Sequence, residues 1–558
     1  MAAPNPTLDA IEAEIGQLFC FGFHGHEPTP EILDLIRTQK LGTIILFSRN
    51  VRSVQQLQDL CHQLQQTARD ANHTQPLLIC LDQENGMVRR LGSTATYFPG
   101  SMALGATRSA EWVAKVSEAT ARELKAIGIN WNLAPAIDVN NNPANPVIGV
   151  RSFGEDPHEV ARLGVAFVKA HQDQKVATSI KHFPGHGDTA VDSHHGIPII
   201  ERTVDDLEEV ELIPFRRAIA EANPASLMVG HIHLPNIMTE EYEDKHLPAS
   251  ISHDIITKLA RERLGYRGMI VTDCLEMEAI SETITAERGS VLALKAGADM
   301  VMVSHVLSRQ IGSISAVKKA LRSGELNLGR VQDAIAAVKQ MKGEYTTWET
   351  ALSRPSLDVI SCEEHVRLSN ECYRETTTLV HDRKRQLPLQ LAQDDQILVL
   401  AIEIPTTLAI EVSVDPLAVA AECVRKRHQK VQAIRIPFSP ESVQGTAIDS
   451  EIRQAIAASR VIVNVSGNAN INPSFRIYYE RYLADIADPS KILVGIGACN
   501  PYDAPVYPNV GSFINTYEFN PPALDSAVGL VFGEFSNHAV SPVTIAGYTE
   551  AKPTAAAL

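Results

Sequence analysis

The chain has 558 residues, of which 44% are apolar and 21% are charged, fractions that exclude the disordered, collagen-like and fibrous classes. This length allows roughly three or four small domains, or one large barrel with a companion domain. Asp and Glu number 66 against 50 Lys and Arg, so the formal net charge is −16. Such a charge repels nucleic acid and acidic membranes, and we expect neither as a partner.

The start of the chain has neither the basic segment nor the apolar segment of a signal peptide, and no later run of about 18 apolar residues would span a bilayer. We therefore expect a cytoplasmic protein. The eight cysteines lie without C-x-x-C spacing, and several fall inside apolar runs, where thiols pack as small hydrophobic groups. Neither a disulfide framework nor a zinc ribbon is indicated.

Short apolar runs alternate with segments of helical periodicity through the first 305 residues. This alternation is typical of a parallel sheet wrapped by helices, and segments such as 110–127 and 157–172 are long enough for crossover helices. Eight runs predict an α/β fold, an N-terminal (β/α)8 TIM-type barrel over residues 1–342. The runs are Ile15–Gly25, Leu41–Phe47, Pro76–Glu84, Trp131–Val139, Val176–Gly185, Ser226–Pro235, Gly268–Met277 and Met300–His305.

The pattern lapses at residues 343–364 into a polar, irregular stretch that we interpret as a linker. Buried-strand candidates then return with helical stretches between several of them, which predicts a smaller C-terminal α/β sandwich domain over residues 365–550. Residues 551–558 are expected to form a flexible tail. The strand candidates are Thr376–His381, Gln396–Ile402, Val431–Ile436, Val461–Val465, Lys491–Gly497 and Phe513–Thr516.

Several runs of the predicted barrel end in polar residues. Active sites of such barrels are built at the carboxyl ends of the strands, so these side chains are candidates for one shared site. They are Asp82 and Glu84, Lys181 and His182, His231 and His233, and Asp273.

Residues 181–198 hold four histidines and two aspartates, and three interpretations are open. The first is a metal site, although the spacing matches no standard metal signature. The second is a polar surface loop without function. The third is general acid/base chemistry, in which a turn brings Asp192 to His194 and the carboxylate orients the imidazole. The potential metal ligands are His182, His186, His194, His195, Asp188 and Asp192.

Asp273 ends the apolar run Gly268-Met-Ile-Val-Thr-Asp273. It is either a structural cap for the following helix or a nucleophile that forms a covalent glycosyl ester. Arg151 is either a ligand for a polar substrate or a partner in a surface salt bridge. Arg90 follows the Asp82–Glu84 pair closely and is a further candidate.

Taken together, these segments resemble glycoside hydrolase family 3, and specifically its β-N-acetylglucosaminidase branch. The resemblance covers nearly the whole predicted barrel, and its most specific part is the combination of Lys181-His-Phe-Pro-Gly-His-Gly with Asp192-Ser-His. The second domain also resembles the α/β domain of longer members. The matching segments are Leu81-Asp-Gln-Glu84, Asn132-Leu-Ala-Pro135 with Asp138, Arg151-Ser-Phe-Gly154, Lys181–Gly187, Asp192–His194 and Val271-Thr-Asp273.

The resemblance implies a role for each matching residue. Asp273 aligns with the nucleophile, His194 with the acid/base, and Asp192 with the residue that orients His194. His231 matches a further pocket position. The residues that align with ligands of the sugar hydroxyls and the N-acetyl group are Asp82, Arg90, Arg151, Lys181 and His182.

These roles predict a cofactor-free, metal-free, retaining exo-β-N-acetylglucosaminidase that acts on a small GlcNAc-containing carbohydrate such as a chitooligosaccharide. Two alternative enzyme activities are phosphorolysis of the same glycosyl-enzyme and β-glucosidase activity. A sugar-binding protein without catalysis is the alternative from a different class. The sequence sets no oligomeric state, and a monomer is compatible with it.

Overall fold

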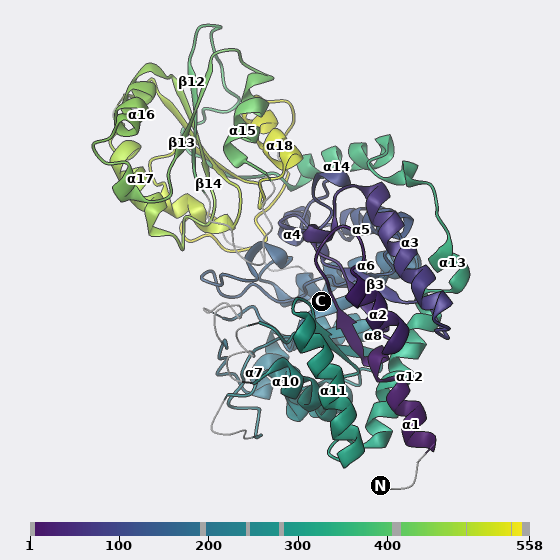
Figure 1. Cartoon of the computed structure of the whole chain (residues 1–558). Coiled ribbons are helices and arrows are strands. Elements are labelled where there is room, and N and C mark those ends of the chain that lie inside the picture. Colours follow the sequence, from purple (N-terminus) through teal and green to yellow (C-terminus); the bar gives the residue numbers. More distant parts are fainter. Residues whose placement is uncertain are drawn as a thin grey trace.

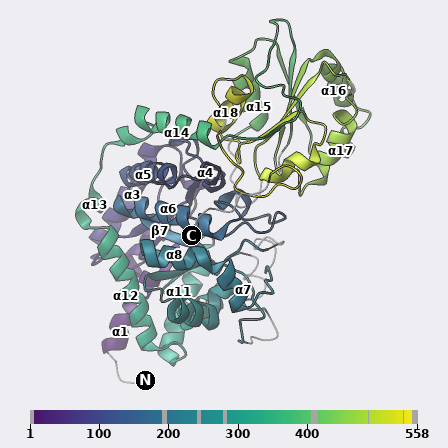
Figure 2. The ribbon, with the colours of Figure 1, turned by 180° about the vertical axis from the view of Figure 1, so that it is seen from behind.

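A computed structural model of the chain describes residues 6–189, 197–240, 246–277, 284–403, 414–486, 488–536 and 538–549. It contains a closed barrel of eight parallel strands and a separate six-stranded sheet. Figures 1 and 2 show the second domain beside helices α4 (Ser101–Thr107) and α14 (Glu363–Thr376). The predicted architecture, a (β/α)8 barrel followed by an α/β sandwich, is confirmed.

The barrel closes in the order β1-β10-β9-β8-β7-β6-β3-β2, so the first strand pairs with the last. Each strand lies inside one of the eight apolar runs, and the barrel strands are buried almost throughout because helices cover their outer faces. The strands are β1 (Phe19–Phe21), β2 (Thr43–Ile45), β3 (Leu78–Leu81), β6 (Trp131–Asn132), β7 (Ala177–Phe183), β8 (Ser226–Val229), β9 (Met269–Cys274) and β10 (Met300–Val303).

Helices between the strands begin and end where the sequence supplies caps. Helix α5 (Ala110–Ile127) begins after Ser109, whose side chain accepts a hydrogen bond from the backbone of the first turn, and ends at Gly128 with φ of +101°. Asp156 caps helix α6 (Pro157–Asp173) in the same way. The other covering helices are α2 (Pro30–Thr38), α3 (Val54–Asp70), α8 (Leu212–Ala222), the π-helix η6 (Asp254–Arg263), α10 (Ala286–Ala296), α11 (Leu307–Ser323) and α12 (Leu328–Tyr345).

The second domain is built on a sheet of order β11-β16-β15-β14-β12-β13, parallel except for the antiparallel pair of β11 and β16. Apolar side chains on both faces of the sheet pack against helices, α16 and α17 on one face and α15 and α18 on the other. The elements are β11 (Thr378–Asp382), β12 (Ile397–Ile402), α15 (Pro416–Arg425), β13 (Val431–Ile436), α16 (Ala447–Ala458), β14 (Val461–Ser466), α17 (Pro473–Tyr482), β15 (Ile492–Gly497), β16 (Ser512–Asn515) and α18 (Pro521–Val531).

The segment between the two domains is more regular than the expected linker. Helix α12 extends to Tyr345, and residues 343–364 also contain α13 (Trp348–Leu352) and the short helix η7 (Leu357–Val359). Polar capping residues such as Thr347 start these helices, and this polarity is what resembles a linker in the sequence. The boundaries at 342, 364 and 550 stay predictions, and the expected tail at 551–558 lies outside the described residues.

No helix within the described ranges is long and apolar enough to cross a membrane. The cytoplasmic location expected from the sequence stays a prediction.

Candidate active site

A pocket of about 500 Å³ opens where the barrel strands end, a volume within the usual range for small-molecule sites. Strands β3, β7 and β9 deliver chemically active side chains to it, and the short hairpin of β4 (Gln83–Asn85) and β5 (Val88–Arg89) adds more. The structure thus brings six of the predicted site residues together in one pocket. These six residues are Asp82, Arg90, Arg151, Lys181, His182 and Asp273.

Asp82 lies between two cations in this pocket. Its carboxylate is 2.8 Å from the Lys181 ammonium and 3.4 Å from the Arg90 guanidinium. Burial raises the pKa of Asp82, but the charges of Lys181 and Arg90 outweigh burial and hold that pKa below its usual value. The Asp82 side chain keeps 16% of its surface exposed, whereas Lys181 keeps 2%. Asp82 is therefore the member of the pair that a ligand can reach.

Glu84 accepts hydrogen bonds from two cations. One carboxylate oxygen is 2.9 Å from Arg151 Nε, and the other is 2.7 Å from both Arg151 Nη2 and Lys181 Nζ. Burial raises the pKa of Glu84, and the opposing charges of Arg151 and Lys181 bring it well below its usual value. The Glu84 side chain is only 3% exposed, so its carboxylate holds the two cations in place rather than meeting a ligand.

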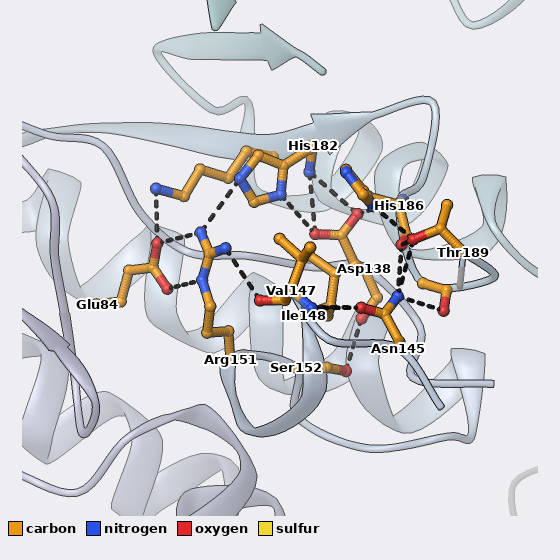
Figure 3. Close-up of polar contacts among 12 residues, drawn as sticks. Glu84, Asp138, Asn145, Val147, Ile148, Arg151, Ser152, His182, His186 and Thr189 are labelled. Atoms are coloured by element: carbon orange, nitrogen blue, oxygen red, sulfur yellow. Dashed lines mark hydrogen bonds and ion pairs between the residues drawn. The ribbon is translucent and has the colours of Figure 1, made fainter. Parts of the chain in front are cut away.

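His182 is fixed between Arg151 and Asp138 (Figure 3). Arg151 Nη2 lies 3.2 Å from His182 Nε2, and a guanidinium only donates, so Nε2 is the acceptor. The ring proton is then assigned to Nδ1, which lies 2.8 Å from the Asp138 carboxylate. Asp138 also accepts from the backbone N–H of His186 at 2.7 Å. Burial raises the pKa of Asp138, but the interactions with His182 and His186 lower it further than burial raises it.

The base of the histidine-rich stretch is held by Asn145. Its amide nitrogen donates to the carbonyls of His186 and Gly187, both at 2.8 Å, and to the Thr189 hydroxyl at 3.2 Å. The ring of His186 contacts the same Thr189 hydroxyl at 3.0 Å. Burial lowers the pKa of His186 to about 4, so this ring is neutral at pH 7.

Asp273 is the second-last residue of strand β9 and lines the pocket, where one carboxylate oxygen accepts from the Cys274 backbone N–H at 2.7 Å. The predicted ligand His231 contacts the end of this strand. Its Nε2 is 2.8 Å from the Cys274 carbonyl oxygen and its Nδ1 is 2.7 Å from the Ser250 hydroxyl. His231 is absent from the described residues that line the pocket, so a binding role for it stays a prediction.

The predicted acid/base His194 and its partner Asp192 lie outside the described residues, and so does His195. Within the described part of the chain, two groups of three potential metal donors lie within 4.8 Å of one another, and neither includes a residue of 181–189. One group, formed by Cys274, Glu276 and His305, lies on the pocket wall. Its Glu276 already accepts hydrogen bonds from two backbone N–H groups at the start of α11. The two groups are Cys274, Glu276 and His305, and Glu240, His253 and Asp254.

The sequence names Glu84 as a candidate at a strand end without a specific role and gives no role to Asp138 or Asn145, although Glu84 and Asp138 fall inside the family motifs. Glu84 and Asp138 carry a signal, because each is an acidic residue near the end of an apolar run predicted as a barrel strand. Asn145 carries no such signal in the sequence, since it acts through a loop whose path depends on tertiary contacts. Phe47 and His305, whose rings lie 5.2 Å apart on the pocket wall, were also missed.

The match to known families covers the whole barrel. A family model described as the glycosyl hydrolase family 3 N-terminal domain matches residues 10–341. The chain belongs to glycoside hydrolase family 3. The resemblance inferred from the sequence motifs is confirmed, and six of the site residues predicted for family 3 line one pocket.

Similar solved structures include family 3 β-N-acetylglucosaminidases. A fungal multi-domain family 3 β-N-acetylglucosaminidase superposes with a TM-score of 0.89 at 42% identity, over 97% of this chain and 61% of that one. A family 3 β-N-acetylglucosaminidase from Paenibacillus sp. str. FPU-7 gives 0.87 at 33% identity, over 96% and 98%. Beta-hexosaminidase A of Pseudoalteromonas piscicida is 36% identical over 56% of this chain, which spans 55% of that relative's length.

Proposed function

We propose that this chain is a retaining exo-β-N-acetylglucosaminidase that releases terminal non-reducing GlcNAc from chitooligosaccharides or related glycosides. The observation that carries the proposal is that Asp273 lines the same pocket as the ion-pair network of Asp82, Lys181 and Arg151. A pocket at the strand ends suits a reaction on the last sugar of a chain. The names of the fungal and Paenibacillus relatives support GlcNAc as that sugar.

The reaction takes two steps that share this pocket. The Asp273 carboxylate attacks the anomeric carbon and forms a glycosyl ester while His194 gives its proton to the leaving glycosidic oxygen. His194 then takes a proton from water, the resulting hydroxide attacks the anomeric carbon, and the Asp273 ester bond breaks to release GlcNAc. Asp192 orients the ring of His194 through both steps. The roles of His194 and Asp192 rest on the family motif.

The sugar is held by charged groups that already pair with one another. Asp82 offers a carboxylate that accepts from sugar hydroxyls, and the Arg90 and Arg151 guanidinium groups donate to sugar oxygens. Because Asp82 and Glu84 are ionised well below neutral pH, this arrangement of charges is constant across the working range of an enzyme. Binding therefore does not depend on titration of these carboxylates near pH 7.

A panel of 4-nitrophenyl β-glycosides with GlcNAc, glucose or xylose tests the substrate. We expect the highest kcat/KM on the GlcNAc glycoside. A preference for glucose would replace the proposal by β-glucosidase activity. Tight binding of GlcNAc without turnover of any glycoside would instead identify a sugar-binding protein.

Replacement of Asp273 by Asn should lower turnover by at least about 10³-fold, since the side chain supplies a covalent bond rather than core packing. The melting temperature and GlcNAc binding serve as controls and should change little. A fluorinated donor sugar that traps the intermediate should leave its adduct on the peptide containing Asp273. An adduct on Asp82 or Glu84 would assign the nucleophile to that residue instead.

A further inference from the structure

One barrel loop, residues 138–155, supplies Asp138, Asn145 and Arg151 to the polar network in Figure 3. Asp138 at its start holds His182, and Arg151 in its second half pairs with Glu84. Between them, Asn145 accepts hydrogen bonds from the backbone of Val147 at 2.8 Å and Ile148 at 2.9 Å. The position of the Arg151 guanidinium in the pocket thus depends on the path of this loop.

The second domain contacts the first half of this loop through side chains. The Tyr502 hydroxyl accepts a hydrogen bond from the Asn140 amide at 2.7 Å, two residues after Asp138. Asn140 is 1% exposed and Tyr502 is 7% exposed, so water does not compete for this bond. The Asn470 amide donates to the Pro143 carbonyl at 3.1 Å.

The second half of the loop meets the same domain next to Arg151. Gly149 has φ of +42°, and the Oδ1 atom of Asn500 lies so close that a Cβ on Gly149 would be 2.3 Å from it. Past Arg151, the Glu155 backbone N–H donates to the Pro542 carbonyl at 3.2 Å, and the Glu155 carboxylate accepts from Thr544. The loop is therefore held on both sides of Arg151.

Such support has a chemical purpose, because the pairing of Arg151 with Glu84 is bidentate. Two parallel N–H to oxygen bonds require a fixed plane and direction of the guanidinium, and a small rotation of the loop loses both. Burial lowers the pKa of Arg151, but the Glu84 carboxylate outweighs burial and keeps the pKa above its usual value. A buried charge that moves away from its partner is costly, so its placement is set by the backbone that carries it.

We propose that Tyr502 and Asn500 of the second domain are positioning residues for Arg151. Tyr502 acts through Asn140, and Asn500 acts through its close contact with Gly149. The second domain then takes part in substrate binding without touching the substrate. The kinetic consequence rests on the proposed glycosidase function, whereas the ordering of the loop does not.

The first test replaces Tyr502 by Phe, which removes the hydroxyl and keeps the ring. We expect kcat/KM on 4-nitrophenyl GlcNAc to fall about threefold to tenfold, mainly through KM, as for loss of one buried hydrogen bond. Tyr478→Phe is the matched control, because the Tyr478 hydroxyl donates to the Pro437 carbonyl at 2.6 Å inside the second domain. Equal kinetic losses in both variants would overturn the proposal.

A double-mutant cycle separates positioning from general destabilisation. In an Arg151→Ala background, Tyr502→Phe should change kcat/KM by less than about twofold, because the group it positions is gone. The same loss in both backgrounds would show that Tyr502 does not act through Arg151, and would contradict the proposal.

Amide hydrogen exchange provides a measurement that needs no substrate. Peptides covering residues 140–155 should exchange faster in Tyr502→Phe than in the parent or in Tyr478→Phe. Asn500→Ala should show the same change around residues 146–151, and it serves if Tyr502→Phe does not fold. Unchanged exchange in both variants would overturn the proposal even if the enzyme is active. Faster exchange in a chain without glycosidase activity would reject only the proposed function.

Discussion

His194 is the residue whose chemistry separates the proposed mechanism from that of a carboxylate acid. After it protonates the leaving oxygen, an imidazole is neutral, whereas a carboxylic acid becomes an anion. A neutral base imposes no charge penalty on an anionic acceptor such as phosphate. Analysis of products in phosphate buffer therefore distinguishes GlcNAc from GlcNAc-1-phosphate, and we expect mainly GlcNAc.

Replacement of His194 by Ala should affect substrates according to their leaving group. Natural sugars need a proton on the leaving oxygen, whereas aryl glycosides with acidic phenols do not, so the first step should slow roughly 10² to 10⁴-fold more on natural sugars. Pre-steady-state release of nitrophenol measures that step. Asp192→Asn should follow the same trend more weakly, because only the orientation of the ring is lost. Equal losses on all leaving groups would remove His194 from the acid role.

At the scale of elements, strand β7 and the segment after it show how far sequence reasoning reaches. The eight barrel strands were predicted because each is a continuous apolar run, and Lys181 and His182 were assigned to the site because they fall at the end of one. The hairpin of β4 and β5 was not predicted, since its residues are mostly polar. Similarly, no periodicity reports that Asn145 reaches His186, because that contact joins two loops.

The histidine-rich stretch after β7 leads to a prediction about the metal dependence of the enzyme activity proposed above. Dialysis against EDTA should leave turnover unchanged, because the proposed steps need no Lewis acid and the rings of His182 and His186 already contact Asp138 and Thr189. The check is activity before chelation, after it, and after each of several divalent ions is added back. Loss of turnover that one ion restores would make the histidine-rich stretch a metal site.

At the scale of the whole molecule, a buried carboxylate joins the two domains. Glu518 of the second domain accepts from the Gly100 backbone N–H of the barrel at 2.9 Å and from the Tyr373 hydroxyl at 2.9 Å. Burial raises the pKa of Glu518 to about 7, against the lowering effect of these hydrogen bonds and of Arg89. Because the folded pKa exceeds the unfolded value, ionisation favours unfolding, and stability is lost as pH rises from about 4.5 to about 7.

Glu518→Gln should therefore change stability in a pH-dependent way. The amide resembles the protonated acid, so the variant and the parent should differ little in free energy of unfolding at pH 4. The variant should become the more stable protein at pH 8, by roughly 1 to 3 kcal/mol. Urea unfolding of both proteins at several pH values gives the difference in free energy of unfolding directly. Buried histidines titrate in the same range, but their contribution is the same in both proteins and cancels in the difference. A difference that does not vary with pH would contradict the raised pKa.

Closure of the barrel by β1 and β10 has a consequence for the growing chain on the ribosome. Phe19 of β1 pairs with Val301 of β10, so one edge of the first strand stays uncovered until the last barrel strand has been synthesised. Until then the nascent barrel exposes two open sheet edges, which are sites of self-association. The loop at 138–155 reaches its final contacts later still, because Asn500, Tyr502 and Pro542 belong to the second domain and are synthesised after the whole barrel. Under the proposed positioning role, Arg151 is therefore held in place only after the second domain has been made, and a chaperone that shields strand edges would raise the yield of folded protein.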